Sequence, residues 1–222
     1  MRYERQVVLD EIGEDGQHRL QNSRVCIVGL GALGCVTSQL LIRAGVGHVF
    51  LLDHDDVETV NLQRQILYDE TDVGKKKVDV AMKKLQDINT DVEIEGEDTL
   101  LSETNTEILE GFDLIFDCTD NMQTRQVIND FCNESGDTWI YAAGSKTEGN
   151  VLVVDDPERF SSVFRSGESF DRCEEVGVVN ALTTVMAGIQ VTEGIKILVG
   201  AKPCTDLIRF DLWENKYEKI SF

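Results

Sequence analysis

The chain has 222 residues, of which 41% are hydrophobic, and this is enough apolar material for the core of one domain but leaves little for a second. Its formal net charge of -20 argues against binding to nucleic acid or to an anionic membrane, because both would repel it. The sequence shows neither a basic leader with an apolar stretch nor a long uninterrupted apolar run, so we expect a cytoplasmic protein without membrane contact.

Apolar runs and helical patterns alternate along most of the chain. Strands are predicted at residues 24–30, 48–53, 91–99, 113–120, 138–145 and 150–156, and the first of them is a nearly continuous apolar run, as expected for a strand buried on both faces of a parallel sheet. Helices are predicted between them at residues 31–47, 75–89 and 121–135. This alternation predicts an α/β fold with a Rossmann-like, doubly wound sheet that is mostly parallel and has right-handed crossovers.

The pattern changes after residue 154. Residues 155–176 are polar, serine-rich and acidic, and they are predicted to form a long crossover loop. An apolar helix is predicted at residues 178–200, and residues 206–222 are predicted to form two antiparallel strands around a turn at residues 214–216. We therefore predict a single domain made of an N-terminal helical arm (1–23), a nucleotide-binding core (24–154), the crossover loop (155–176) and a C-terminal helix with strands (177–222).

The junction between the first strand and the first helix carries the spacing Gly29-x-Gly31-x-x-Gly34. Gly29 permits a tight turn, Gly31 lets the backbone approach a phosphate, and Gly34 lets helix and strand touch. Asp53, at the end of the next strand, can accept hydrogen bonds from ribose hydroxyls. The strand before the glycines, the helix after them and the acid beyond favour a nucleotide site over a purely structural glycine turn.

The polar residues that come next favour a nucleoside triphosphate over a dinucleotide. Asn61, Arg64 and Gln65 follow the second strand, and Lys77 lies at the start of the next helical pattern. A triphosphate carries extra phosphate charge, which needs cationic and amide donors of this kind. Arg64 and Lys77, together with the glycine turn, are therefore predicted to clamp the phosphates.

Asp117, Asp120 and Asn121 stand at the end of the strand predicted at residues 113–120. Open α/β sheets bind ligands at the carboxyl ends of their strands, so these side chains belong to the predicted site. Asp120 can hold Mg²⁺, a hard cation that takes one or two carboxylates and leaves other positions to phosphate oxygens and water. The alternative is that Asp117 or Asp120 only caps the helix that follows.

The ordered set of motifs resembles the ThiF/MoeB/HesA branch of the ubiquitin-activating enzyme superfamily, over almost the entire chain. The matching pieces are "RYERQ", "GLGALG", "LLDHD", "VNLQRQ", "DVGKKKVD", "DCTDN" and "CEEVGVV". The resemblance implies that ATP and Mg²⁺ activate the C-terminal Gly-Gly carboxylate of a ubiquitin-like sulfur carrier or modifier, giving an acyl-adenylate and pyrophosphate. It does not identify the pathway, since thiamin, molybdopterin, tRNA thiolation and protein conjugation all use this step.

The resemblance also implies a role for each matching residue. It assigns Asp53 to the ribose, Asn61, Arg64 and Lys77 to the triphosphate, Gln65 and Asn121 to the same nucleotide site, and Asp120 to Mg²⁺. In the family, the arginine at the position of Arg5 reaches across a homodimer to the ATP of the partner subunit. No general base is expected, because the carboxylate that attacks is already ionised at neutral pH.

The cysteines bear on zinc and on a possible covalent step. Many members of the family bind zinc through two C-x-x-C pairs, and since none of the six cysteines here forms such a pair, we predict no zinc. Cys173 matches a position at which some relatives link covalently to the carrier through sulfur. Its acidic neighbours act to raise the thiol pKa and Arg172 acts to lower it, so a covalent role and an inert thiol both stay open. The other five cysteines are predicted to be packing residues.

Two further functions compete with adenylation. An NAD-dependent Rossmann oxidoreductase would use the glycine turn, but it would leave Arg64, Lys77 and Asp120 unexplained. A non-catalytic scaffold that binds a ubiquitin-like protein would agree with the loss of the zinc pairs, but it would not need every charged position that the chain retains.

Overall fold

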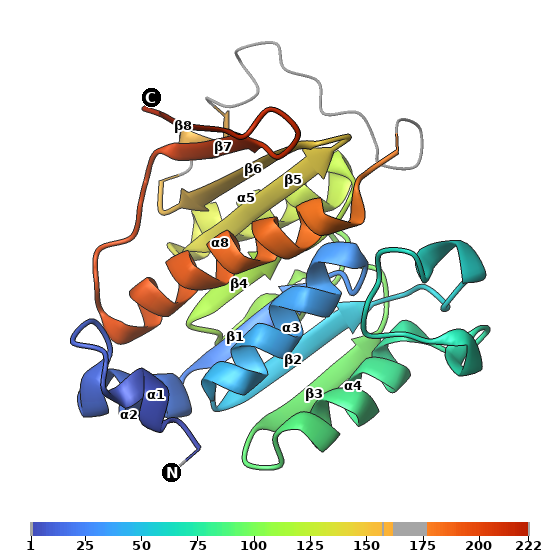
Figure 1. Ribbon diagram of the computed structural model, residues 1–222, viewed down its shortest axis with the longest axis horizontal. Helices are drawn as coiled ribbons and strands as arrows, with labels where there is room; N and C mark the ends of the chain where they lie inside the picture. The colour runs from blue at the N-terminus through green and yellow to red at the C-terminus, as the bar shows by residue number, and fades with distance from the viewer. Residues whose placement is uncertain (1, 157, 162–176, 222) are drawn as a thin grey trace.

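The computed structural model describes residues 2–156, 158–161 and 177–221. These residues contain one sheet of eight strands in the order β3-β2-β1-β4-β5-β6-β7-β8 (Figure 1). The strands are β1 (Arg24–Val28), β2 (His48–Asp53), β3 (Glu93–Asp98), β4 (Leu114–Asp117), β5 (Trp139–Ser145), β6 (Glu148–Val154), β7 (Leu207–Asp211) and β8 (Lys216–Ile220). Strands β1 to β5 pair in parallel, and β6 to β8 are added antiparallel. The predicted fold class is confirmed.

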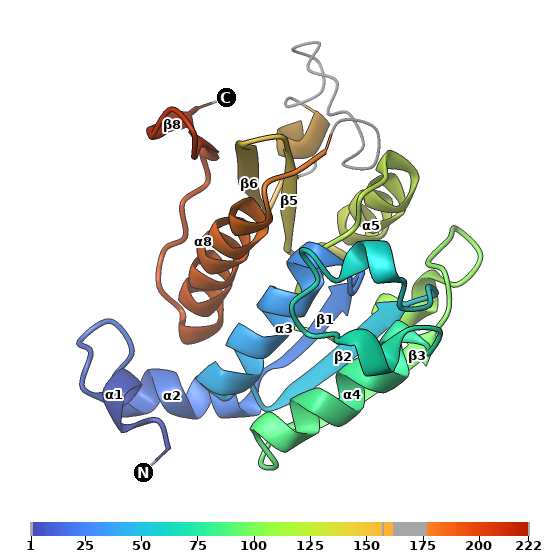
Figure 2. The same cartoon turned by 45° about the vertical axis from the view of Figure 1, so that its right-hand side comes forward.

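Helices cover both faces of this sheet. They are α1 (Glu4–Val7), α2 (Gly13–Asn22), α3 (Ala32–Ala44), α4 (Lys77–Ile88), α5 (Met122–Ser135) and α8 (Asn180–Val199), with the 3-10 turns η1 (Thr59–Asn61), η2 (Glu70–Asp72) and η3 (Thr106–Leu109). Helices α3, α4 and α8 lie on one face and α5 on the other (Figure 2). The crossovers through α3 and α4 run in one direction from β1, and the crossover through α5 runs in the opposite direction. Crossovers between parallel strands are right-handed as a general rule, which puts these helices on opposite faces.

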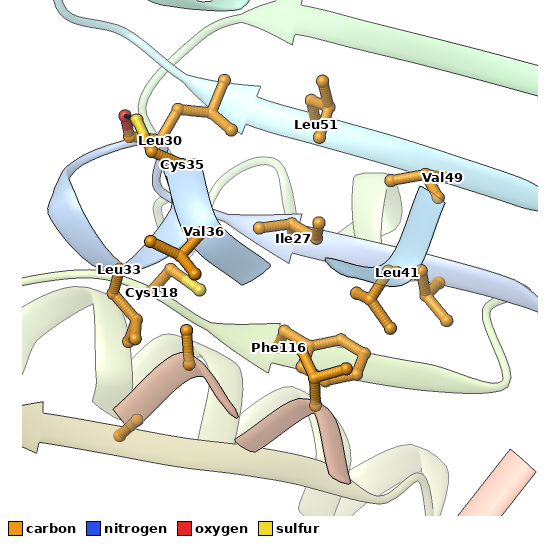
Figure 3. Packing of buried hydrophobic residues seen from close by; sticks show 14 of the residues in the cluster. Ile27, Leu30, Leu33, Cys35, Val36, Leu41, Val49, Leu51, Phe116 and Cys118 are labelled. Atoms are coloured by element: carbon orange, nitrogen blue, oxygen red, sulfur yellow. Dashed lines mark hydrogen bonds between the residues drawn. The ribbon is translucent and has the colours of Figure 1, made fainter. Parts of the chain in front are cut away.

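Side chains along each strand alternate between two cores. In β1, Ile27 belongs to the core on the α3 side, whereas Cys26 and Val28 belong to the core on the α5 side. Figure 3 shows Ile27 on the sheet together with Val36 and Leu41 of α3. A strand with helices on both faces must be apolar on both, which is why this run lacks the alternation of polar and apolar residues. Each such buried side chain contributes about 1.5–3 kcal/mol of burial free energy.

Helix α8 crosses the core on the α3 face. By length and composition it could span a membrane, with 20 residues and a mean hydropathy of 1.3, but half of it is buried in the protein, against α3, β5 and β6. Its fully buried Gln190 donates to the carbonyl oxygens of Asp117 (2.8 Å) and Ile140 (3.1 Å) and accepts from Thr37 Oγ1 (3.0 Å). These bonds fix α8 to β4, β5 and α3, so it serves as a core helix.

The N-terminal arm docks at the amino end of the parallel strands. Gln6 Nε2 donates to the carbonyl oxygen of Ala44 at the end of α3 (2.9 Å), and Tyr3 Oη accepts from Asn89 Nδ2 (2.8 Å). Arg5 lies between these two anchors and is exposed. It is on α1, at the end of the molecule away from the carboxyl ends of β1 and β2 (Figure 1).

The polar stretch after β6 begins with a helical turn. Residues 158–161 are helical, and Phe160 packs at 4.9 Å from Trp139 and 5.8 Å from Tyr141 between ring centroids. One buried aromatic side chain thus holds this part of the stretch against the α5-side core. Further on, the predicted turn between the last two strands is present, with Asn215 at a φ of 53°, a left-handed conformation that asparagine tolerates.

Candidate nucleotide-binding site

The strand order reverses between β1 and β4. From β1 the chain proceeds to β2 and β3 on one side, and from β4 it proceeds to β5 on the other. At such a point the loops leave in opposite directions and open a crevice at the carboxyl ends of the two strands. A cavity of about 470 Å³ lies there, and its lining includes residues from both strand ends. This size falls in the usual range for small-molecule sites.

The glycine turn forms one wall of the cavity. Gly29 has a φ of 95°, and a Cβ there would lie 2.7 Å from the carbonyl oxygen of Cys118. Gly31 is the N-cap of α3 and lines the cavity, so the free N–H groups of the first helical turn are available to an anion. A Cβ on Gly34 would overlap the carbonyl oxygen of Gly29. Gly29 and Gly34 therefore need glycine, the first for its left-handed conformation and both for a close approach of backbone atoms. A Cβ on Gly31 would meet only Gln65 Nε2, at 3.8 Å, so its role in admitting a phosphate stays a prediction.

Asp53 joins the glycine turn to the end of β2. Its Oδ2 accepts from the backbone N–H of Leu30 (2.6 Å), and its Oδ1 accepts from the backbone N–H of Asp55 (2.8 Å). Burial raises the pKa of Asp53, and the nearby charge of Lys77 opposes this effect. Each carboxylate oxygen can accept more than one hydrogen bond, so the group keeps capacity for a ribose hydroxyl in the cavity that it lines.

The segment from Asn61 to Gln65 forms a second wall. Asn61 is buried, and its Oδ1 caps η1 by accepting from the backbone N–H of Glu58 (3.1 Å). The backbone N–H groups of Arg64 and Gln65 then donate to the carbonyl oxygen of Asn61, at 3.0 and 2.9 Å. Gln65 is only 3% exposed, and its Oε1 has no hydrogen-bond partner among the described residues. A buried acceptor without a partner fits a ligand that brings a donor.

Lys77 begins α4 and extends into the cavity. Its side chain is 5% exposed, and its Nζ lies 2.7 Å from Asp55 Oδ2. The sequence alone did not single out Asp55, because it stands in the run "DHDD", which resembles a solvated charged turn. Arg64, in contrast, makes no ion pair with the described residues, and its Nη1 donates only to the carbonyl oxygen of Val60 (3.2 Å).

The end of β4 is held by a buried ion pair. Asp117 is fully buried, and it accepts from Arg125 Nε (3.0 Å) and from Thr119 Oγ1 (2.6 Å). Arg125 also donates to the carbonyl oxygen of Thr119 (2.6 Å), so it fixes the loop that carries Asp120. Sequence reasoning missed Arg125. Its position one turn after the helix N-cap, at Asn121, is the signal that could have placed it on the side of α5 that faces β4.

The capping alternative for the two aspartates is wrong. Asn121 is the N-cap of α5, and its Oδ1 accepts from the backbone N–H of Thr124 (2.9 Å). Asp117 instead pairs with Arg125, and Asp120 is an exposed residue that lines the cavity. Asn121 also lines the cavity, so its capping role does not remove it from the site.

Acidic groups outnumber basic ones around the cavity. The described lining contains five carboxylates, from Asp53, Asp55, Asp56, Glu58 and Asp120, and three permanently cationic side chains, from Arg64, Lys77 and Arg125. An anionic ligand would be repelled by this balance unless a divalent cation accompanied it. Carboxylate oxygens such as those of Asp120 are the ligands that Mg²⁺ prefers, so the residues present fit a nucleotide with its metal ion.

Arg5 is not among the described residues that line this cavity. Arg5 is on α1, beyond the amino ends of the strands (Figure 1). Cys173 lies outside the described residues. The other cysteines pack as predicted: Cys26, Cys35, Cys118 and Cys132 are buried and Cys204 is partly buried. Burial raises the pKa of Cys35 and of Cys132 to about 12, so neither thiol is reactive at neutral pH.

Comparison with known sequences gives a family match over almost the entire chain. Residues 3–222 match the model of the ThiF family. The sulfur carrier protein ThiS adenylyltransferase of Escherichia coli is 37% identical over 227 residues, with 100% of this chain and 90% of that protein covered. The SAMP-activating enzyme E1 of Haloferax volcanii is 33% identical over 228 residues, covering 100% and 84%. The chain is 38% identical over 205 residues to the adenylyltransferase and sulfurtransferase MOCS3 of Culex quinquefasciatus, but it spans only 47% of the length of that protein.

Solved structures with the same fold also match. The crystal structure of PaaA superimposes with a TM-score of 0.82 at 26% identity, covering 98% of this chain and 72% of PaaA. A crystal structure of E. coli MccB with ATP gives a TM-score of 0.79 at 21% identity, covering 92% and 65%. The likeness to MccB extends to the fold alone. Both comparisons agree with the mixed eight-stranded sheet described above.

Proposed function

This chain belongs to the ThiF family and is an adenylyltransferase, and we propose that it uses ATP and Mg²⁺ to activate the C-terminal Gly-Gly carboxylate of a ubiquitin-like sulfur carrier or modifier. A carboxylate oxygen of the carrier attacks the α-phosphorus of ATP. The bond from that phosphorus to the bridging oxygen of the β-phosphate breaks, and pyrophosphate leaves with the electron pair. The product is an acyl-adenylate of the carrier.

One observation carries this proposal. Side chains from the glycine turn, the end of β2, the segment after η1, the start of α4 and the end of β4 line a single cavity at the switch point of the sheet. The resulting set of donors includes Arg64 and Lys77, which an NAD-dependent enzyme would not need. Nucleotidyl transfer depends mainly on positioning and on stabilising charge, and this arrangement supplies both.

The chemistry of each side chain determines which part of the substrate it binds. Asp53 binds the ribose, while Asn61, Arg64 and Lys77 hold the triphosphate as charge builds up on the leaving pyrophosphate. When bound, Mg²⁺ supplies positive charge to the phosphate oxygens and is held by Asp120. Arg125 keeps the Asp120 loop in place through its bond to the carbonyl oxygen of Thr119.

We also propose that the active unit is a homodimer to which Arg5 contributes in trans. The exposure of Arg5 and its distance from the cavity of its own chain support this assignment (Figure 1). A mixture of Arg5→Ala and Arg64→Ala subunits should regain activity in heterodimers, because one of the two sites then has both arginines. Mixed dimers with no more activity than the separate variants would rule out the contribution in trans.

ATP–pyrophosphate exchange tests the main proposal. The assay is run with each ubiquitin-fold protein ending in Gly-Gly that the same genome encodes, and carrier-dependent exchange is the expected result. Arg64→Ala and Asp120→Ala should abolish exchange, whereas the exposed controls Lys202→Ala and Asp130→Ala should retain it. Carrier binding without exchange would support the scaffold instead, and reduction of NAD would support the oxidoreductase.

A second variant separates activation from any later covalent step. Formation of the acyl-adenylate uses no thiol, so Cys173→Ala should leave exchange intact and remove only a later thioester or persulfide. Loss of exchange in a correctly folded Cys173→Ala protein would contradict this division of roles.

A further inference from the structure

Asp55 connects Lys77 to the end of β2 through three hydrogen bonds. Its backbone N–H donates to Asp53 Oδ1 (2.8 Å), and its backbone carbonyl oxygen accepts from the N–H of Lys77 (3.0 Å). Its side-chain Oδ2 accepts from Lys77 Nζ (2.7 Å). The first bond connects Asp55 to the carboxylate that holds the glycine turn, and the other two fix both ends of Lys77. Asp55 thus connects Lys77 to Asp53 and, through Asp53, to the glycine turn.

The two side chains of this pair differ in exposure. The Lys77 side chain is 5% exposed, whereas that of Asp55 is 50% exposed, and both line the cavity. The other carboxylate oxygen of Asp55 lies 3.4 Å from His54 Nε2. Partial burial acts to raise the pKa of Asp55, but the hydrogen bond and the charge of Lys77 outweigh it and hold the pKa below its ordinary value. Asp55 is therefore ionised at neutral pH.

A restrained lysine is a better phosphate ligand than a free one. Its ammonium group carries three donors on a flexible four-carbon stem, and holding that stem in one conformation costs entropy. One donor used by Asp55 leaves two for phosphate oxygens. The conformational entropy of the lysine side chain is then lost during folding and not in the transition state. Placement matters there, because misplacing a charged group by about 1 Å can reduce a rate about 100-fold.

We propose that Asp55 is a positioning residue that holds the Lys77 ammonium toward the phosphates during adenylation. This inference rests on the proposed function. It makes a specific prediction, because Asp55 also places a negative charge beside an anionic substrate. Removal of that charge should favour ATP binding and at the same time release Lys77. Binding and catalysis should therefore change in opposite directions, which a general disruption of the site would not produce.

The test compares Asp55→Asn and Asp55→Glu with the wild-type protein. The control is Asp98→Asn, which removes an exposed carboxylate from the neighbouring Lys76 (3.4 Å) and does not line the cavity. Calorimetry with Mg-ATP should give Asp55→Asn an affinity equal to or greater than that of the wild type. Its kcat for carrier-dependent exchange should fall about 10- to 100-fold. Asp55→Glu should recover part of kcat, because the longer carboxylate can still reach Lys77, and Asp98→Asn should match the wild type in both measurements.

Other results would overturn the inference. Weaker ATP binding together with lower kcat in folded Asp55→Asn would make Asp55 a general structural residue, and an unchanged kcat would give it no role. In both cases exchange by the wild type would leave the proposed function standing. Absence of wild-type exchange with every carrier would remove the proposed function and this inference together. If Asp55→Asn does not fold, ATP affinity and kcat are measured on Asp55→Glu instead. Weaker ATP binding by Asp55→Glu would refute the positioning role.

Discussion

Substitution of Gly34 by alanine tests whether the glycine turn depends on close packing of α3. Gly34 lies in the first turn of α3, where an added Cβ would overlap the carbonyl oxygen of Gly29 and lie 2.9 Å from its carbonyl carbon. It would also lie 3.4 Å from Cys118 Cβ. The first two obstacles are backbone atoms of the turn itself, so no side chain can rotate to make room. To reach an ordinary van der Waals distance, α3 must move away from Gly29 by about 1.4 Å.

The expected magnitude follows from that displacement. Overpacking of a rigid site costs about 1–3 kcal/mol of unfolding free energy, which exceeds the gain of about 0.5–1 kcal/mol that alanine normally gives in a helix. Gly188 provides the matched control, because it lies within α8 and a Cβ there meets nothing within 4 Å. Gly188→Ala should therefore be more stable than the wild type by about 0.5–1 kcal/mol. The same chemical change thus has opposite signs at the two positions.

Urea unfolding followed by tryptophan fluorescence measures both variants. Trp139 is 1% exposed and reports loss of the core, whereas Trp213 is already 75% exposed and contributes little change. A shift of the turn by about 1 Å should also weaken Mg-ATP binding or turnover by up to about 100-fold in Gly34→Ala alone. Gly34→Ala with wild-type stability and wild-type ATP affinity would show that helix and turn are not packed as described.

Three further changes probe other parts of the molecule. Gln190→Leu removes the partner of three buried polar groups and should lower the unfolding free energy by about 2–4 kcal/mol in urea titrations. An unchanged unfolding free energy would argue against the three hydrogen bonds by which Gln190 fixes α8. Burial acts to raise the pKa of Asp72, but hydrogen bonds from Lys84 and from the Asp69 backbone outweigh it and hold the pKa below its ordinary value. The ionised Asp72 therefore stabilises the folded protein above pH of about 4, and this stabilisation is lost as the pH falls through the folded pKa. Asp72→Asn should accordingly lose about 1 kcal/mol at pH 7 and progressively less below pH of about 4, and a deficit independent of pH would refute the pair. In a Cys173→Ser protein, a thiol reagent at pH 8 should modify at most the partly buried Cys204 before urea is added, and rapid labelling of further thiols would contradict the described burial.

The fold could be predicted because its signals are local. Residues 48–53 contain the apolar run 49–52, with a glycine directly before residue 48 and an aspartate at residue 53, and β2 has these bounds in the structure. The glycine spacing reports contacts between residues at most five apart, and Gly29 and Gly34 make the predicted close approach. The turn at Asn215 rests likewise on neighbouring residues and their backbone preferences. The signal for each of these features lies within a few residues of the chain.

The contacts that hold the site could not be predicted in the same way. Arg125 pairs with Asp117 because α5 packs its first turns against the end of β4, and the sequence shows there only an arginine in an amphipathic helix. Phe160 lies in a polar stretch, and its burial depends on Trp139, which is far away in the chain. The choice of Asn121 as N-cap was within reach of sequence reasoning, since asparagine is a preferred cap and stands directly before the first helical residue.

The charges of the cavity explain how an acidic protein can serve a tetra-anionic substrate. Lys77 is already paired with Asp55, and Arg125 with Asp117, so Arg64 is the only lining cation that has no carboxylate partner within the described part of the chain. Long-range attraction therefore contributes little, and the net charge of -20 opposes it. What remains are directed donors at short range, from the start of α3 and from the fixed side chains, together with the Mg²⁺ that we propose, which would offset the surrounding carboxylates. Such a site selects its anion by geometry more than by total charge. The hydrogen bonds of Asp53, Asp55 and Arg125, which position the glycine turn, Lys77 and the Asp120 loop, therefore matter as much as the groups that contact the anion.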